Sequence, residues 1–316
     1  MIISYTAREE DKGRKVYSIL RFEMKASAAL TRRLKAAGAI YVSGVPVFTD
    51  YRVTPGETVS ADIGAAEQPC DNVPEQGEIE ILFENEGLLA VNKPPGLIVH
   101  PTRSRNEGTL SNFVAGYLSG SGGVCHAVNR LDRDTSGIVL FAKNSYMKAR
   151  ASEALSDKSA IKEYMAIVQG IMPESGVIEA PIRRLGERNM LRVVSPDGQK
   201  AVTQYGTINV CRLREYEASL VRMRLETGRT HQIRVHCLHL GRPVLGDMLY
   251  GTEESRAASR AFGITKQALH AHKLAFTEPL SCEYLEITAA PPENFACFLQ
   301  KDMLTFIGAS PRRDSR

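Results

Sequence analysis

The sequence predicts a mixed α+β protein built from one smaller and one larger unit. Strand-like segments outnumber helix-like ones, no regular βαβ rhythm or internal repeat is present, and a polar stretch without a hydrophobic period interrupts the chain after residue 64. With 316 residues, 43% of them hydrophobic, the chain is long enough to bury a sizeable core. We therefore expect a small N-terminal unit over residues 1–64, a linker over 65–77, a larger unit over 78–308 and a polar C-terminal tail over 309–316.

The N-terminal unit contains a short amphipathic helix, expected over residues 28–37. Ser27 is a preferred N-cap residue, Leu30 and Leu34 recur at helical spacing, and Gly38 suits a left-handed C-cap. After the helix, short apolar stretches predict strands around a hairpin at residues 40–42, 45–47 and 58–63.

Three cationic side chains of this helix, Arg32, Arg33 and Lys35, lie off its apolar stripe. Residues 1–40 hold nine Lys or Arg against four Asp or Glu. The helix could therefore present a basic face to phosphate groups. An ordinary solvated helix face is the alternative interpretation.

The larger unit alternates strands and helices around glycine and proline turns. The expected strands are rich in aliphatic and β-branched residues and cover residues 79–83, 88–92, 138–142, 164–168 and 220–225. Residues 93–96, with two prolines and a glycine, predict a tight turn. Asn144 can cap a helix in which Met147 and Ala151 recur on one face.

Composition excludes several classes of protein. Six cysteines lie far apart with no Cys-x-x-Cys pair, which argues against a disulfide scaffold and a cysteine zinc site. The N-terminus lacks the apolar core of a signal peptide, and no apolar run approaches the roughly 18 residues of a membrane span. The net charge of +4 permits a polyanionic partner without requiring one. We therefore expect a soluble protein of the reducing cytoplasm, with no membrane partner.

The densest polar cluster of the chain spans residues 129–137. It places Asp132 between Arg130 and Arg133. Neighbouring positive charge keeps a carboxylate ionised, and an ionised carboxylate can act as nucleophile, base or charge stabiliser. A salt-bridged turn capped by Thr135 is the alternative, because structural ion-pair networks perturb carboxylates in the same way.

A second polar cluster spans residues 226–236. Thr230 can cap a helix that runs to Gly241. Arg234 would then lie about one turn into the helix, beside the positive end of the helix dipole, which favours anions. This position suits a phosphate or a carboxylate.

Three histidines, His231, His236 and His239, lie in the same segment. His236 and His239 share a helix face, which suggests metal binding. However, no carboxylate or third ligand stands at a usual spacing, and arginines crowd the same turn. No metal is therefore expected.

The polar clusters belong to a series of motifs that follow one another along the larger unit. They are Arg130-Leu131-Asp132 with Thr135-Ser136-Gly137, Lys162-Glu163-Tyr164, the run from Thr227 to His236, Gly246-Asp247 with Tyr250-Gly251, and Leu269-His270-Ala271. In type and order they resemble the motifs of the RluA/RluD-type pseudouridine synthases, and residues 92–96 with 100–101 are similar to that family's opening motif. The resemblance covers about residues 80–295. Asn129 stands where many members have histidine, a difference that concerns the subfamily rather than the activity.

The resemblance implies the pseudouridine synthase fold, in which a mixed, largely antiparallel central sheet carries flanking helices. It also implies a reaction that needs no cofactor: the glycosidic C–N bond of a uridine in RNA breaks, the uracil turns, and a C–C bond forms to ring carbon five. Asp132 would be the essential carboxylate, acting on the anomeric carbon or on the uracil ring. Arg234 would pair with Asp132 and keep it anionic, with Arg229 as the alternative partner. Tyr164 would offer the uracil a flat face and a hydroxyl, unless it is an ordinary strand-core tyrosine.

The same resemblance implies an RNA partner, with ribosomal RNA expected first and transfer RNA second. Residues 1–64 resemble, more weakly, the small S-four-like α/β RNA-binding domain that often precedes this catalytic domain. The target base must leave its helix, which costs least in a loop or bulge. Arg130 would fill the vacated space or bind the flanking phosphate, and a basic groove of Arg130, Arg133, Arg229 and Arg234 would steer a monomeric enzyme to RNA.

Two other interpretations remain open from the sequence. A non-catalytic RNA-binding protein would share the arginines, but it would not need Asp132, Tyr164 and Arg234 together. A metal-dependent hydrolase would use the histidines, and a strong chelator would then abolish its activity.

Overall fold

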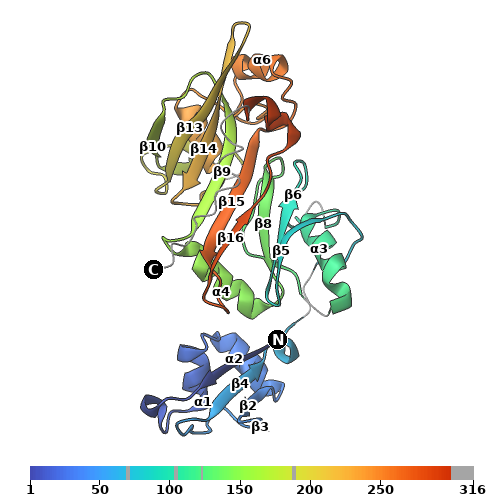
Figure 1. Cartoon of the computed structure of the whole chain (residues 1–316), viewed down its shortest axis with the longest axis vertical. Helices are drawn as coiled ribbons and strands as arrows, with labels where there is room; N and C mark the ends of the chain where they lie inside the picture. The colour runs from blue at the N-terminus through green and yellow to red at the C-terminus, as the bar shows by residue number, and fades with distance from the viewer. Residues whose placement is uncertain (69–71, 103–105, 122–123, 187–189, 300–316) are drawn as a thin grey trace, which may run out of the picture.

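The computed structural model describes residues 1–68, 72–102, 106–121, 124–186 and 190–299. It consists of a small N-terminal unit and a larger unit, stacked end to end (Figure 1). The expected end of the larger unit at residue 308 and the tail over 309–316 lie outside the described residues. No helix of the described part is long and apolar enough to cross a membrane.

The N-terminal unit is a small antiparallel sheet with short helices. Its strands follow the order β1 (Ile2–Thr6), β4 (Thr58–Asp62), β2 (Ile40–Val42) and β3 (Val45–Pro46). The helical segments are η1 (Glu9–Asp11), α1 (Val16–Ser18), η2 (Ile19–Glu23), α2 (Ala28–Ala36) and η3 (Gly64–Ala66). The predicted helix is confirmed, because Ser27 Oγ accepts the backbone N–H of Leu30 at 3.1 Å and Gly38 has a φ of 63°. Strand β1 carries no signal that the sequence analysis detected.

The larger unit is built on one long, mostly antiparallel sheet. Its described strands follow the order β10 (Ser175–Glu179), β13 (Val202–Leu213), β14 (Tyr216–Leu225), β9 (Ile161–Gln169), β15 (Leu269–Thr277), β8 (Ser136–Ala142), β6 (Leu88–Lys93) and β5 (Glu80–Glu84). Strand β16 (Tyr284–Thr288) pairs with β15, β7 (His126–Ala127) pairs with β8, and β11 (Ile182–Arg184) pairs with β12 (Arg192–Val194). The predicted mixed, largely antiparallel sheet is confirmed.

Helices flank this sheet, as Figure 1 shows. They are α3 (Leu110–Leu118), η4 (Ser119–Ser121), α4 (Ser145–Ser156), α5 (Gln232–His239), α6 (Glu253–Ala261) and η5 (Glu293–Phe298). The predicted cap of α4 is confirmed, because Asn144 Oδ1 accepts the backbone N–H of Met147 at 2.8 Å. Met147 and Ala151 are fully buried, so the predicted apolar face of α4 is the face that packs on the sheet.

A parallel pairing of β8 with β15 joins two of the sequence motifs. Gly137 of β8 lies opposite Ala271 of β15, with a φ of 107°. A Cβ added at Gly137 would lie 2.3 Å from the carbonyl oxygen of Ala271, so only glycine permits this approach. Beside it, the Ser136 hydroxyl lies 2.9 Å from Nδ1 of His270, a fully buried imidazole whose pKa burial lowers to about 4. These contacts between Ser136-Gly137 and His270-Ala271 hold the two motifs together and fix the position of the start of β8.

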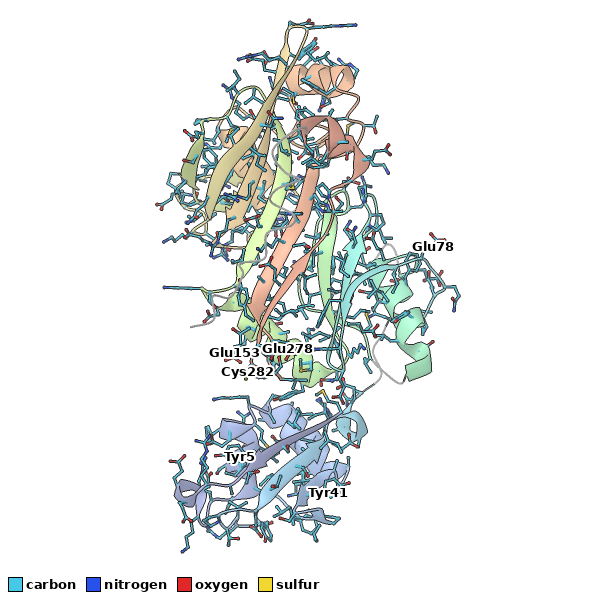
Figure 2. The ribbon with its side chains drawn as sticks, in the orientation of Figure 1. Tyr5, Tyr41, Glu78, Glu153, Glu278 and Cys282 are labelled. Carbon is cyan, nitrogen blue, oxygen red and sulfur yellow. The ribbon has the colours of Figure 1, made fainter. Side chains whose placement is uncertain are left out.

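The two units share one apolar core and a polar contact. Buried residues of the N-terminal unit and of the sheet face carrying Leu88 and Ile138 form a single contiguous cluster. Figure 2 shows Glu153, Glu278 and Cys282 at the end of the larger unit that faces the N-terminal unit. The N-terminal unit is thus packed against the larger unit.

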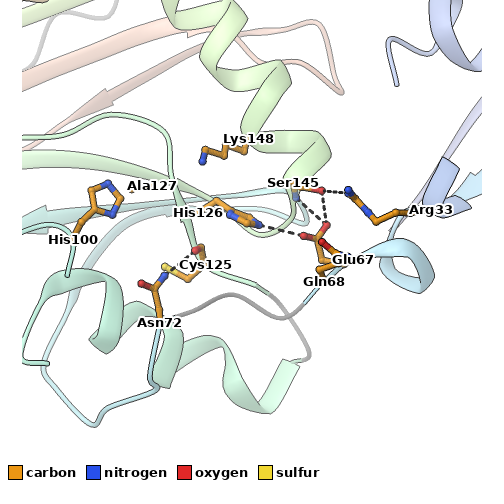
Figure 3. Close-up of a pocket in the computed structure, with 10 residues that line it drawn as sticks. All are labelled: Arg33, Glu67, Gln68, Asn72, His100, Cys125, His126, Ala127, Ser145 and Lys148. Atoms are coloured by element: carbon orange, nitrogen blue, oxygen red, sulfur yellow. Dashed lines mark hydrogen bonds and ion pairs between the residues drawn. The ribbon is translucent and has the colours of Figure 1, made fainter. Parts of the chain in front are cut away.

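The polar contact lies around a cavity of about 330 Å³ between the units (Figure 3). Glu67 accepts hydrogen bonds from the backbone N–H and the hydroxyl of Ser145, both at 2.9 Å, and lies 3.2 Å from His126. Downstream, Asn72 donates to the Cys125 carbonyl at 3.2 Å. The described part of the predicted linker is therefore docked on the larger unit.

Arg33 belongs to this contact and not to an exposed basic face. Its Nε donates to the Ala66 carbonyl at 2.8 Å and its Nη2 to the Ser145 hydroxyl at 3.0 Å. Arg32 and Lys35 are exposed, as expected. The expectation for Arg33 is corrected because α2 turns that side chain toward α4.

Candidate active site

The chemistry-bearing motifs meet in one cavity of about 1040 Å³. Asp132 reaches it from the loop before β8, Tyr164 from β9 and Arg234 from α5. The sheet thus brings together three residues that the sequence places in separate motifs.

An arginine between two carboxylates forms the polar centre of the cavity. Arg234 Nη1 donates to Asp132 Oδ2 at 2.8 Å, while its Nε and Nη2 donate to the two carboxylate oxygens of Asp247 at 2.7 and 2.8 Å. Asp247 is fully buried, whereas the Asp132 side chain keeps 27% of its surface exposed. Although burial alone would lower it, these two carboxylates raise the pKa of Arg234. Arg234 is therefore a fixed cation, and one side of Asp132 stays open to the cavity.

The structure confirms the pairing of Arg234 with Asp132 and places Arg229 elsewhere. Arg229 is exposed, and its Nε donates to the Lys200 carbonyl at 3.0 Å. Asp247 was seen in the sequence only as part of a motif, and its role as the second anchor of Arg234 was missed.

The helix that carries Arg234 begins differently from the prediction. Its N-cap is His231, in the left-handed region with a φ of 58°, and not Thr230. The preceding loop is held by Gln232, whose Oε1 accepts the Arg229 N–H at 3.0 Å and whose Nε2 donates to the Val202 carbonyl at 3.0 Å. These contacts with β13 fix the start of α5, so a side-chain cap from Thr230 is not needed.

His231 turns the Nε2 edge of its ring toward the open side of Asp132. Its Nδ1 lies 2.8 Å from the Tyr250 hydroxyl, which also accepts the backbone N–H of Arg192 at 2.8 Å. The Tyr250 hydroxyl therefore joins the His231 ring to the backbone of Arg192, and the second ring nitrogen, Nε2, faces Asp132. This nitrogen lies 3.8 Å from Asp132 Oδ1. Burial lowers the pKa of His231, more than the charge of Asp132 raises it, so the ring is neutral.

Tyr164 lies on β9, opposite Met223 of β14 and Ala271 of β15. It is partly buried, and it lines the cavity with Asp132. Burial, helped by the negative charge of Asp132, raises the pKa of Tyr164. The side chain is therefore a phenol at neutral pH.

The loop of Asp132 is anchored by a lysine that the sequence analysis did not single out. Lys93 is fully buried, and its Nζ donates to the carbonyls of Pro94, Leu97 and Arg133 at 3.0, 2.8 and 2.8 Å. The predicted turn is present at Gly96, whose N–H donates to the same Arg133 carbonyl at 2.9 Å. The opening motif of the larger unit therefore holds the backbone that carries Asp132.

Three of the predicted RNA-contacting arginines line the cavity and are exposed, and one of them, Arg133, is paired with a carboxylate. Arg130 and Arg229 line the cavity and are exposed. Arg133 also lines it, but its Nη2 donates to the Asp134 carboxylate at 2.9 Å. Asn129, next to Arg130, binds the backbone of β8 through the Leu140 N–H at 2.7 Å. The positive charge that faces solvent here comes mainly from Arg130 and Arg229.

His231 and His236 have separate partners. His236 lies 2.9 Å from both the Thr203 hydroxyl and the Ala180 carbonyl, and His239 is exposed. Within the described ranges, no group of three His, Cys, Asp or Glu side chains is arranged to hold a metal ion.

Comparison with known proteins identifies the class that this fold and site define. Residues 87–239 match the family described as RNA pseudouridylate synthase. Together with the relatives below, this match shows that the chain belongs to this family, whose members isomerise uridine in RNA, and the resemblance seen in the motifs of the larger unit is confirmed.

Individual relatives support the same assignment over most of the chain. An RNA pseudouridine synthase of Bacillus subtilis, YhcT, is 36% identical over 90% of this chain and 92% of its own length. The ribosomal large subunit pseudouridine synthase D of Zymomonas mobilis is 38% identical over 75% of this chain and 77% of its own length. Among solved structures, human RNA pseudouridylate synthase domain containing 1 is 25% identical, covers 74% of this chain and 96% of its own, and superposes with a TM-score of 0.59.

Proposed function

We propose that this RNA pseudouridine synthase modifies specific uridines of ribosomal RNA, with transfer RNA as the second candidate. Relatives from Zymomonas mobilis and Buchnera aphidicola carry the name ribosomal large subunit pseudouridine synthase D, at 38% and 32% identity. We further propose that it works as a monomer in the cytoplasm. The observation that carries the catalytic assignment is the Arg234–Asp132 pair inside the cavity.

Asp132 supplies the essential carboxylate in this proposal. Arg234 occupies Oδ2, which leaves Oδ1 to act on the anomeric carbon or on the uracil ring. In either route the C1′–N1 bond breaks, a C1′–C5 bond forms, and the hydrogen of C5 leaves as a proton while N1 gains one. The fixed cation Arg234 keeps the carboxylate oriented and anionic through these steps.

Tyr164 provides the flat face on which the uracil rests and turns. A neutral phenol suits this role, because an apolar ring face stacks on a base without requiring a counter-charge. Its protonated hydroxyl has a second role, as a hydrogen-bond donor to the base while the base turns, but with its raised pKa it does not accept the C5 proton. The Tyr164→Phe variant separates the two roles, since it keeps the ring face and removes the hydroxyl.

Exposed cations in the lining of the cavity attract the phosphates of the RNA and guide it to the active site. Arg130 and Arg229, with Arg133 beside its partner Asp134, contact phosphates next to the target. Residues 1–64 act as an S-four-like RNA-binding domain through Arg32 and Lys35, which are exposed. Arg33 supports this function indirectly, because it binds α2 to the larger unit.

Mapping of pseudouridines in total RNA, with and without the gene, tests the substrate. The proposal predicts that one or a few positions of ribosomal RNA lose the modification without the gene and regain it when purified enzyme is added. Loss confined to transfer RNA would replace ribosomal RNA by the second candidate. No change in any RNA would contradict both.

A further inference from the structure

The first turn of α4 connects the larger unit to the N-terminal unit (Figure 3). The backbone N–H and the hydroxyl of Ser145 both donate to Glu67 at 2.9 Å, and the same hydroxyl accepts Arg33 Nη2 at 3.0 Å. The next residue, Tyr146, belongs to the shared apolar core, and its hydroxyl donates to the Met24 carbonyl at 3.0 Å. We refer to Arg33, Glu67, Ser145 and Tyr146 as the joint.

The joint is a closed ionic and apolar contact. The Glu67 side chain is 9% exposed and lies 3.2 Å from His126. Burial would raise the pKa of Glu67, but the hydrogen bonds with His126 and Ser145 outweigh it and lower that pKa. Glu67 is therefore an anion at neutral pH. Buried charges with fixed partners favour one arrangement of the packed parts over others.

A single strand connects the joint to the catalytic carboxylate. Strand β8 begins four residues after Asp132 and ends three residues before Ser145. It lies between β15 and β6 in the sheet, and all seven of its residues are buried. At about 3.3 Å per residue, its ends lie about 20 Å apart. The distance from Asp132 to the joint is therefore set by a rigid element.

The joint also fixes the cations of α2. Arg33 binds Ser145 and the Ala66 carbonyl, whereas Arg32 and Lys35 of the same helix are exposed. One side of α2 is thus anchored on the larger unit and the other side faces solvent. Arg32 and Lys35 consequently lie at a constant distance from the active site.

The surface between α2 and the active site carries further positive charge. His100 lines both the inter-unit cavity and the cavity of Asp132. After burial, the charges of Arg130 and Lys148 are the causes that lower the pKa of His100, so both cations lie near this ring. Arg130 and Lys148 are exposed. An RNA that occupies the active site can therefore follow cations toward the N-terminal unit.

We propose that the joint sets the spacing at which this enzyme selects its uridine. Because α2 is held at one distance from Asp132, only uridines that lie at the matching distance from the RNA segment bound by α2 engage both sites together. This inference rests on the proposed function, in which Arg32 and Lys35 contact RNA. Two linked binding sites reinforce each other only when the geometry allows both to be occupied. A rigid connection thus converts spacing into a difference of affinity between uridines.

The proposal predicts a specific consequence of loosening the joint. The N-terminal unit would then bind its RNA segment at variable distances from Asp132, so RNAs with different spacings would become similar substrates. An RNA too short to reach α2 should react at the parent rate, because Asp132, Tyr164 and Arg234 are untouched. The joint residues therefore act as positioning residues.

The test uses the full-length enzyme and a large-subunit ribosomal RNA transcript whose uridines carry tritium at C5, from which tritium is released when C5 bonds to the ribose. The modified position is located first. The segment bound by α2 is identified as the protection from hydroxyl radicals that Arg32→Ala/Lys35→Ala loses. Three RNAs are then compared: one with the natural spacing, one lengthened by three nucleotides between the two sites, and one without the α2 segment.

For the parent, lengthening the RNA should lower kcat/KM by about tenfold, the loss of simultaneous binding at the second site. For Glu67→Ala/Ser145→Ala, the natural and lengthened RNAs should differ by less than about twofold. On the short RNA, the two enzymes should agree within about twofold, which also shows that the catalytic unit is folded. Tyr146→Phe, which removes only the hydroxyl that binds Met24, should give an intermediate dependence on spacing and serves as the milder second variant.

The control is Glu217→Ala, which breaks the Arg212–Glu217 ion pair within β13–β14 and should keep the spacing dependence of the parent. A parent that is indifferent to spacing would overturn the inference, as would joint variants with the same spacing dependence as the parent. Failure of the proposed function would look different: no tritium release from the transcript by the parent, or no protection that depends on Arg32 and Lys35. Either of these results would contradict the proposed function itself, and the inference would fall with it.

Discussion

Arg234 donates to Asp132 at 2.8 Å across 102 positions of sequence, and it does so while its other two donor groups are held by Asp247. The fold thus supplies the carboxylate with a cation that cannot move away. Asp247 is fully buried, so the arrangement depends on charges being matched inside the protein.

Arg234→Ala should lower turnover by about a hundredfold or more, the usual range for removing one preorganised donor at a reacting charge. Arg234→Lys should lose less, because it keeps the charge, but an ammonium group cannot bind two carboxylates in the planar manner of a guanidinium. Single-turnover tritium release and RNA binding, measured separately, check this. Equal losses of binding and turnover would instead make Arg234 a phosphate contact.

Asp247→Asn should reduce both stability and turnover while leaving RNA affinity nearly unchanged. It leaves Arg234 with one carboxylate partner in a buried site, at a cost of about 3 kcal/mol or more in the free energy of unfolding. The asparagine oxygen can still accept the Leu249 and Tyr250 N–H groups, so the turn itself should persist. Urea unfolding and tritium release test the two effects. A stable, fully active Asp247→Asn enzyme would show that Asp132 alone suffices to hold Arg234.

Lys93 predicts a pH dependence of stability. Burial lowers the pKa of Lys93 to about 7, although the negative charges of Asp134 and Asp132 raise it. A lysine in the unfolded chain titrates at about 10.4. Between these values the unfolded chain binds more protons, so this group makes the free energy of unfolding rise with pH. The stability difference between the parent and Lys93→Met should therefore grow from pH 7 to pH 9 in favour of the parent, by up to about 1.4 kcal/mol per unit. Urea unfolding at pH 7, 8 and 9 measures it, and a flat or falling difference would be the opposite of the prediction.

The cations of α2 should divide into two groups. Arg32→Ala and Lys35→Ala should each flatten the slope of log affinity for RNA against log salt by roughly 0.7 to 0.9, if each side chain contacts one phosphate. Arg33→Ala should instead cost about 1 to 2 kcal/mol of stability, since it loses one hydrogen bond to Ala66 of η3 and one to Ser145 of the larger unit, and should change the slope little. A slope that is unchanged in Arg32→Ala and Lys35→Ala would mean that this helix face is simply solvated.

Features that depend on neighbours in sequence were predictable. Ser27 and Asn144 cap helices through backbone N–H groups three residues away, so the cap residue and the apolar spacing were enough. The motifs also placed Asp132, Tyr164 and Arg234 in one site, because their resemblance to a known family carried the tertiary information that spacing lacks.

Features that depend on distant contacts were not predictable in this way. Thr230 looked like a helix cap, but Gln232 fixes the loop through β13 and lets His231 start the helix in a left-handed conformation. Arg33 looked like a surface cation, but Ser145 of another helix binds it. The anchoring roles of Asp247 and Lys93 likewise require partners that only the folded chain brings together.

The Asp132→Asn variant separates the charge of this side chain from its shape, and so decides whether the Asp132 carboxylate performs the isomerisation. Asparagine keeps the shape and removes the charge, so folding and RNA affinity should stay within about twofold of the parent while tritium release from C5-labelled ribosomal RNA falls to background. Asp134→Asn is the matched control, because Asp134 lies two residues further on and binds the exposed Arg133, and it should remain active. Full activity in Asp132→Asn, or an equal loss in Asp134→Asn, would contradict the account.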